Sequence, residues 1–123
     1  MTKILIIEDE AFIVEALRFL CEKEGWRVDA ESDGAAALER ISAVKPDIVL
    51  LDFMLPNMDG LDILKALRRR DATKDLPIMM LTAKGQMRER NLAELAGVTC
   101  FMTKPFSNAE LVAQLRLMIE NTR

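Results

Sequence analysis

The sequence predicts an α/β fold: a doubly wound parallel sheet of five strands, with five helices divided between its two faces. Short apolar runs alternate strictly with longer amphipathic segments along the chain, which is the pattern of repeated strand–helix units. The apolar runs are continuous rather than alternating with polar residues, as expected for strands that helices cover on both faces. The connections between neighbouring parallel strands should then be right-handed.

The first two strand–helix units cover the N-terminal third of the chain. The run KILII at 3–7 is apolar and rich in β-branched residues, which favours a buried strand. The segment 9–25 ends in a glycine and carries apolar residues at helical spacing: Ile13, Ala16, Leu17 and Leu20. WRVDAE at 26–31 is more polar and predicts a strand at an edge of the sheet. Helix-forming residues follow at 34–44, before Pro46.

The third and fourth units contain the most apolar strands. Residues 48–52 predict a buried strand that ends in a carboxylate, and 76–82 predict another that is apolar almost throughout. The helix expected over 59–70 has a clear apolar stripe, formed by Leu61, Leu64, Ala66 and Leu67. The helix expected over 84–96 has a thin apolar face, formed mainly by Leu92, Leu95 and Ala96.

The fifth unit completes the pattern. VTCFM at 98–102 predicts the last strand, and Ser107 is placed to cap a final helix that carries Leu111, Leu115 and Met118. No linker, repeat or low-complexity tract interrupts the chain, so residues 1–123 are expected to form one domain.

Composition narrows the class of protein. The chain carries 20 acidic and 17 basic residues, a net charge of −3, which argues against a broad surface for nucleic acid or anionic membranes. The basic triplet at 68–70 is interpreted as a solvated helix end. No apolar run approaches the roughly 18 residues of a membrane span and no signal-peptide pattern is present, so we expect a cytoplasmic protein. Cys21 and Cys100 fit no metal or redox spacing and are expected to be core thiols.

The sequence contains no histidine. This excludes Ser-His-Asp and Cys-His mechanisms within the chain, and also a histidine metal site. Acid–base or nucleophilic chemistry must therefore come from carboxylates, lysine or hydroxyl groups. Any metal would be held by oxygen ligands, which favours a hard cation such as Mg²⁺.

Chemically reactive side chains gather where the predicted strands end. They are Glu8, Asp9 and Glu10 after the first strand, Asp52 at the tip of the third, Thr82 at the end of the fourth and Lys104 after the fifth. In an open parallel sheet, ligands bind at the carboxyl ends of the strands. We therefore expect these carboxylates, one hydroxyl and one ammonium group to converge on a single rim.

Electrostatics indicate what this rim could bind. Two carboxylates about 4 Å apart at a protein surface repel by roughly 4 kcal/mol, so a cluster stays ionised only beside a cation. Lys104 supplies one positive charge, too few for three acids, and Mg²⁺ is the natural complement. A carboxylate in such a site can attack phosphorus and form an aspartyl phosphate, while metal and lysine neutralise the transferring group.

Four motifs, each at the end of a predicted strand, together resemble the receiver domain of two-component response regulators. They are ILIIEDE, PDIVLLDFMLPNMDG, PIMMLTA and CFMTKPF. The resemblance extends essentially from end to end, so it implies that 1–123 is a single receiver domain, similar to the chemotaxis regulators. It also implies a flavodoxin-like three-layer sandwich with sheet order 2-1-3-4-5.

The resemblance assigns roles to particular residues. Asp52 would be the phosphoacceptor and would also contact Mg²⁺ or Mn²⁺, which Asp9 would bind directly, Glu8 through water, and Met54 through its backbone carbonyl. Thr82 and Lys104 would contact the phosphoryl group, Phe101 would be the switch aromatic, and Pro56 and Gly60 would shape the loop after Asp52. The chain departs from the commonest pattern in having Phe rather than Tyr as the switch residue. Met54 and Lys84 occupy positions that influence access of water to the phosphoryl group in the family.

The resemblance also implies partners. A sensor histidine kinase or a phosphotransfer protein would donate the phosphoryl group, since this chain has neither histidine nor a nucleotide-binding glycine loop. The domain would catalyse only its own phosphorylation and dephosphorylation, and is not otherwise an enzyme. Its fourth helix, fifth strand and fifth helix would then signal to a downstream target protein or a detached output domain, without direct contact with nucleic acid or membrane. A phosphorylation-dependent dimer is left open.

Simpler interpretations exist for the same residues. Asp52 could cap the following loop toward Asn57, and the acidic run after the first strand could complement a helix dipole, which we prefer for Glu10 but not for Asp9. Lys104 could be a solvated surface lysine, Thr82 a β-branched strand residue and Phe101 an ordinary core aromatic.

Three other functional classes compete with the receiver. A binding-only pseudo-receiver would not need the complete set of acids, hydroxyl and lysine that this chain carries. A small hydrolase of the aspartyl-phosphate type would need a second acid where Met54 stands. A dinucleotide-binding domain would need a glycine fingerprint that is absent.

Overall fold

The computed structural model describes residues 1–83 and 87–121. Its centre is a five-stranded sheet in the order β2-β1-β3-β4-β5, in which every neighbouring pair is parallel. The strands are β1 (Lys3–Ile7), β2 (Arg27–Glu31), β3 (Ile48–Asp52), β4 (Ile78–Thr82) and β5 (Cys100–Thr103). The predicted sheet order is confirmed, and the polar strand β2 lies at an edge as predicted.

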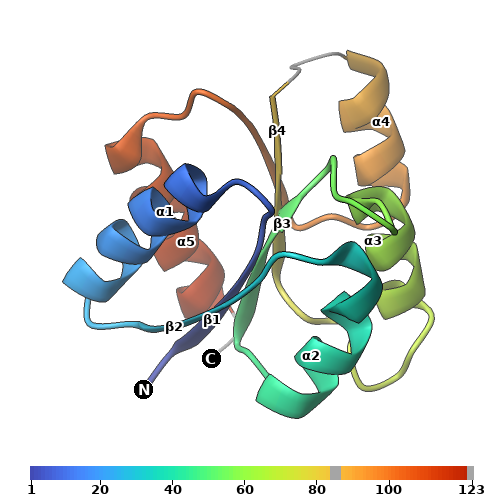
Figure 1. Cartoon of the computed structure of the whole chain (residues 1–123), viewed down its shortest axis with the longest axis horizontal. Helices are drawn as coiled ribbons and strands as arrows, with labels where there is room; N and C mark the ends of the chain where they lie inside the picture. Colours follow the sequence, from blue (N-terminus) through green and yellow to red (C-terminus); the bar gives the residue numbers. More distant parts are fainter. Residues whose placement is uncertain (84–86, 122–123) are drawn as a thin grey trace.

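Helices cover both faces of the sheet and complete a three-layer sandwich. Helices α1 and α5 lie on one face, and α2, α3 and α4 lie on the other (Figure 1). Their bounds are α1 (Ala11–Lys23), α2 (Ala37–Val44), α3 (Gly60–Arg68), α4 (Met87–Leu95) and α5 (Asn108–Asn121). A 3₁₀ turn, η1 (Gly34–Ala36), precedes α2. Ser107 accepts a hydrogen bond from the backbone N–H of Glu110 at 3.3 Å, as expected of a helix cap.

Alternate residues of each central strand enter opposite cores. In β1, Ile4 and Ile6 face α1 and α5, whereas Leu5 and Ile7 face the other three helices. This alternation explains why the strands are continuously apolar, because both faces of the sheet exclude water. The final helix contributes Leu111, Leu115 and Met118 to the first core, as the sequence predicts.

The predicted apolar face of the fourth helix is wrong. Ala93 is the residue of α4 that is buried, while Leu92 is partly exposed and Leu95 is 87% exposed. Ala96, just beyond the helix, does pack against the core. Lys84, the first residue of the expected helix, lies outside the described residues.

One smaller expectation also fails, and another holds only in part. Ala16, expected on the apolar stripe of α1, is exposed, and the buried positions of that helix are Leu17 and Cys21. In the basic triplet at 68–70, Arg69 and Arg70 are exposed, as expected of a solvated helix end. Arg68 instead donates hydrogen bonds to the backbone carbonyls of Gly97 at 2.9 Å and Thr73 at 3.0 Å. It therefore ties the end of α3 to the loop that precedes β5.

Two of the expectations from composition can be compared with the structure. Cys21 and Cys100 carry free thiols; the first is buried and the second partly buried. Among the described residues, no helix combines the length and hydropathy required to cross a bilayer.

Candidate functional site

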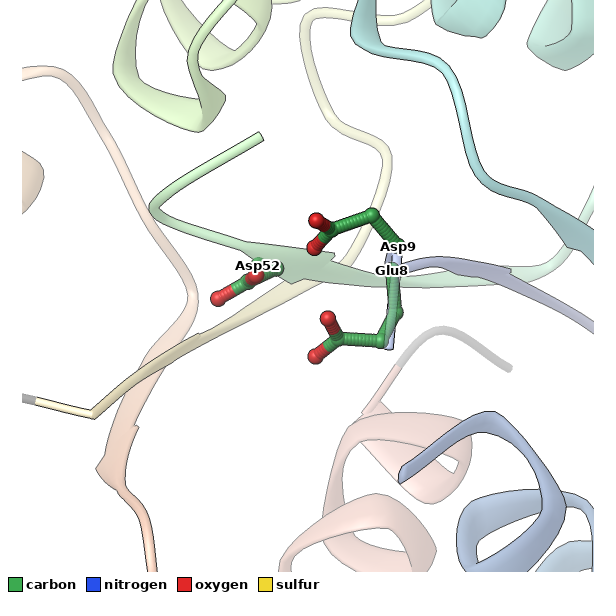
Figure 2. Close-up of side chains that lie close together, drawn as sticks. All are labelled: Glu8, Asp9 and Asp52. Atoms are coloured by element: carbon green, nitrogen blue, oxygen red, sulfur yellow. The ribbon is translucent and has the colours of Figure 1, made fainter. Parts of the chain in front are cut away.

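The acidic side chains meet at the carboxyl ends of the two central strands. β1 pairs with β3, so Glu8 and Asp9, which follow β1, lie beside Asp52, the last residue of β3. One carboxylate oxygen from each of the three lies within 4.8 Å of the others. Figure 2 shows the three carboxylates projecting from the same edge of the sheet. The backbone N–H of Glu10, which occupies the N-cap position of α1, donates to the Glu8 carboxylate at 3.1 Å and fixes its orientation.

Lys104 supplies the positive charge of this pocket. It follows β5, and its ammonium nitrogen Nζ lies 2.5 Å from Glu8 Oε1 and 3.2 Å from Asp52 Oδ1. The lysine side chain is only 10% exposed, and Glu8 and Asp52 are 2% and 4% exposed. Because the structure buries Lys104 and pairs it with two acids, the interpretation of a solvated surface lysine is wrong.

Burial controls the ionisation of the pocket. It raises the pKa of Glu8 above its ordinary value, and the hydrogen bond and charge of Lys104 oppose it only in part. Burial raises the pKa of Asp52 as well, although Lys104 favours the ionised form. For Lys104 itself burial lowers the pKa, but the hydrogen bond to Glu8 and the charges of both acids outweigh it, so the pKa is raised. Burial in the folded state therefore opposes the simultaneous ionisation of Glu8 and Asp52, even with Lys104 beside them.

The donor set fits a hard divalent cation. Three carboxylates from two adjacent strand ends offer oxygen ligands to a single point, which is the chemistry that Mg²⁺ prefers. A second positive charge would also relieve the cost of keeping Glu8 and Asp52 ionised.

The loop after Asp52 is shaped by two close backbone approaches. A Cβ atom on Gly60 would lie 2.2 Å from the carbonyl oxygen of Asp52, and one on Gly34 would lie 2.0 Å from that of Met58. The side chain of Asn57, at a positive φ of 69°, donates to Asp33 Oδ1 at 2.9 Å. The Asn57 side chain thus fixes the loop to Asp33, while the Asp52 carboxylate accepts a backbone hydrogen bond from Met54 at the start of the same loop, as the loop-cap interpretation expects.

Replacing Gly60 by alanine should destabilise the protein by about 3 kcal/mol, because the new methyl group would force the Asp52 backbone to move. The free energy of unfolding in urea measures this cost. Gly25→Ala is the matched control: a Cβ there has nothing within 4 Å, and the φ of +87° should limit the cost to about 1–2 kcal/mol. Equal losses in the two variants would contradict this account of the loop.

The other predicted residues lie on or near the same rim. The backbone N–H of Met54 contacts the Asp52 carboxylate, and its side chain is exposed. Thr82, at the end of β4, is fully buried, and its hydroxyl donates to Glu89 Oε2 at 2.9 Å. Phe101, in β5, is 9% exposed and packs in the core formed with α2, α3 and α4. Sequence reasoning missed Glu89, which no strand-end motif marks.

Residues 4–116 match the family described as "Response regulator receiver domain". The chain belongs to this family. The receiver domain is a signalling domain of two-component response regulators, so the resemblance drawn from the four motifs is confirmed.

Curated relatives of this receiver domain are longer proteins. It is 37% identical over 123 residues to the phosphate regulon transcriptional regulatory protein PhoB of Rhizobium meliloti, covering all of this chain and 54% of that protein. It is 40% identical over 119 residues to the sensory transduction protein RegX3 of Mycobacterium bovis, covering 97% of this chain and 51% of the relative. The chain therefore spans about half the length of the curated relatives it matches.

Solved receiver structures share the fold. A putative response regulator from Chloroflexus aurantiacus superposes with a TM-score of 0.92 at 32% identity, covering 97% of this chain and 98% of that one. The BeF3-activated N-terminal receiver domain of Klebsiella pneumoniae RstA superposes with a TM-score of 0.90 at 32% identity, covering 96% and 98%. The flavodoxin-like architecture predicted for the receiver domain is thus confirmed.

Proposed function

We propose that this receiver domain accepts a phosphoryl group on Asp52 in a Mg²⁺-dependent reaction and signals through a change of surface. One observation carries the proposal. The carboxylate at the tip of the central strand is buried beside Lys104 and two further acids, an arrangement that favours binding of a cation and then of an anionic group.

Each residue of the site would have a separate role in the reaction. An oxygen of Asp52 attacks the phosphorus of a phosphohistidine on the donor; the new P–O bond forms as the P–N bond breaks, and the freed imidazole takes up a proton. Lys104, held beside Asp52, neutralises negative charge on the transferring group. Asp9, Asp52, the Met54 carbonyl and, through water, Glu8 would hold Mg²⁺ or Mn²⁺. When bound, the metal supplies charge neutralisation and orientation of the phosphoryl oxygens.

The signal would pass from the phosphoryl group to the surface. Thr82 would bond a phosphoryl oxygen, and Phe101 would repack behind it, altering the face of α4, β5 and α5. Hydrolysis catalysed by the domain itself would later reset it. The donor would be a sensor histidine kinase or phosphotransfer protein in the cytoplasm. The recipient would be a downstream target protein or an output domain, and a phosphorylation-dependent dimer fits the same scheme.

Treatment with an acyl phosphate tests this function without the kinase. Intact-mass spectrometry should show one phosphoryl group added per chain, with Mg²⁺ and not with EDTA. A pseudo-receiver would stay unlabelled under both conditions. Many turnovers of the acyl phosphate with no lasting adduct would instead support a hydrolase.

Mg²⁺ should also stabilise the fold. At a free Mg²⁺ concentration 100 times its Kd, the free energy of unfolding should rise by about 2.7 kcal/mol, because only the folded state brings the ligands together. Urea titrations of the metal-free protein with Mg²⁺, or with NaCl of equal ionic strength, measure the gain. Asp9→Asn should reduce it, whereas Asp71→Asn, an exposed acid beyond α3, should not. A gain of the same size in NaCl would rule out a specific site.

A further inference from the structure

Glu89, on the first turn of α4, contacts the hydroxyl that the proposed function assigns to the phosphoryl group. Thr82 Oγ1 donates to Glu89 Oε2 at 2.9 Å, and the threonine is fully buried at the end of β4. A hydroxyl has a single proton to donate. While Glu89 accepts that proton, Thr82 cannot donate it to a phosphoryl oxygen.

The acceptor is a carboxylate, which makes this contact stronger than an ordinary hydrogen bond. Charge-assisted hydrogen bonds are roughly twice as strong as neutral ones, and burial of the donor excludes competing water. Binding of a phosphoryl group must therefore compete with an existing interaction. Such a competitor lowers the fraction of molecules that are ready to react.

Helix α4 buries little of its own side-chain surface. Ala93 is its buried residue, and Leu95, which was expected to pack inward, faces solvent. Beside Glu89, the guanidinium of Arg90 lies over the ring of Phe101, 5.9 Å from the centroid, and pairs with Glu94. Two adjacent residues on one turn thus contact the proposed switch hydroxyl and the proposed switch aromatic. A change at Thr82 would be transmitted directly to this turn.

We propose that Glu89 is a positioning residue that holds the Thr82 hydroxyl in the resting conformation and competes with the phosphoryl group for its proton. The proposal rests on the proposed function, since it assumes phosphorylation at Asp52. Phosphorylation then breaks the bond between Thr82 and Glu89 and releases the first turn of α4. The hydrogen bond between Thr82 and Glu89 therefore stabilises the resting conformation of the unphosphorylated protein.

Removing the carboxylate should accelerate phosphorylation. With an acyl phosphate below saturation and Mg²⁺, Glu89→Ala should be labelled about 10-fold faster than wild type, because more molecules have an available hydroxyl. Glu89→Gln keeps an uncharged acceptor and should be accelerated only about threefold. Glu120→Ala, which removes an exposed acid from α5, should be labelled at the wild-type rate. Thermal melting shows that each variant is folded before its rate is compared.

A double-mutant cycle separates this mechanism from a general effect of charge on an anionic donor. In a Thr82→Ala background, labelling is slower, and adding Glu89→Ala should change its rate by less than about twofold. An equal rate for Glu89→Ala and wild type would overturn the proposal, and so would an acceleration that persists without Thr82. If wild type itself is not labelled, the proposed phosphoacceptor function fails, and this proposal falls with it.

Discussion

Asp52→Asn is expected to abolish labelling by an acyl phosphate and, in the metal-free protein, to raise stability at neutral pH. The amide cannot act as the nucleophile, so the adduct should fall below detection. Burial raises the pKa of Asp52 despite Lys104, which means that ionised Asp52 costs the folded state free energy. Removing that charge should therefore increase the free energy of unfolding by about 1–2 kcal/mol. This is a part of the roughly 4 kcal/mol by which two carboxylates about 4 Å apart repel each other.

The pH dependence of this gain has a definite sign. Below the ordinary carboxyl pKa of about 4, Asp52 is neutral in both folded and unfolded states, so wild type and variant should converge. As pH rises through the raised pKa of the folded state, wild type loses stability that Asp52→Asn keeps. Urea unfolding at several pH values in EDTA measures the difference. Asp71→Asn is the control, and labelling of Asp52→Asn at the wild-type level would refute the assignment.

The fold could be predicted from the sequence because its determinants are local. Continuous apolar runs at 3–7 and 48–52 coincide with β1 and β3, since strands covered on both faces have no polar side. The prediction fails where tertiary contacts override local pattern. Leu95 matches a helical stripe yet faces solvent, because the small Ala93 allows α4 to approach the core instead. Arg68 resembles a solvated helix end, but distant carbonyl groups accept its hydrogen bonds.

The rim of the site was predictable for a similar reason. In a parallel sheet the strand ends converge whatever the loop lengths, so Asp9, Asp52 and Lys104 had to lie near one another once the strands were assigned. The partner of Thr82 follows no such rule. Glu89 lies seven residues further along the chain, in α4, and nothing in the local sequence indicates which way its side chain turns.

Lys104→Met should have a large effect on both chemistry and stability. The ammonium group pairs with Glu8 and Asp52, and its loss removes the charge that compensates these two buried carboxylates. In EDTA at neutral pH, the free energy of unfolding should fall by about 3–5 kcal/mol. Labelling in Mg²⁺ should slow by on the order of 100-fold, because the ammonium group beside the transferring group is lost. Lys74→Met, at an exposed position after α3, changes net charge equally and should alter neither measurement.

Lowering the pH should restore part of the stability that Lys104→Met loses. The pKa values of Glu8 and Asp52, already raised by burial, should rise further without Lys104, so protons bind more readily to the folded state. Stability is then fully retained below the ordinary carboxyl pKa of about 4 and is lost as pH rises through the raised values. Urea unfolding of Lys104→Met should therefore show a steeper fall between acidic and neutral pH than wild type. Two parallel pH profiles would mean that Lys104 does not compensate these acids.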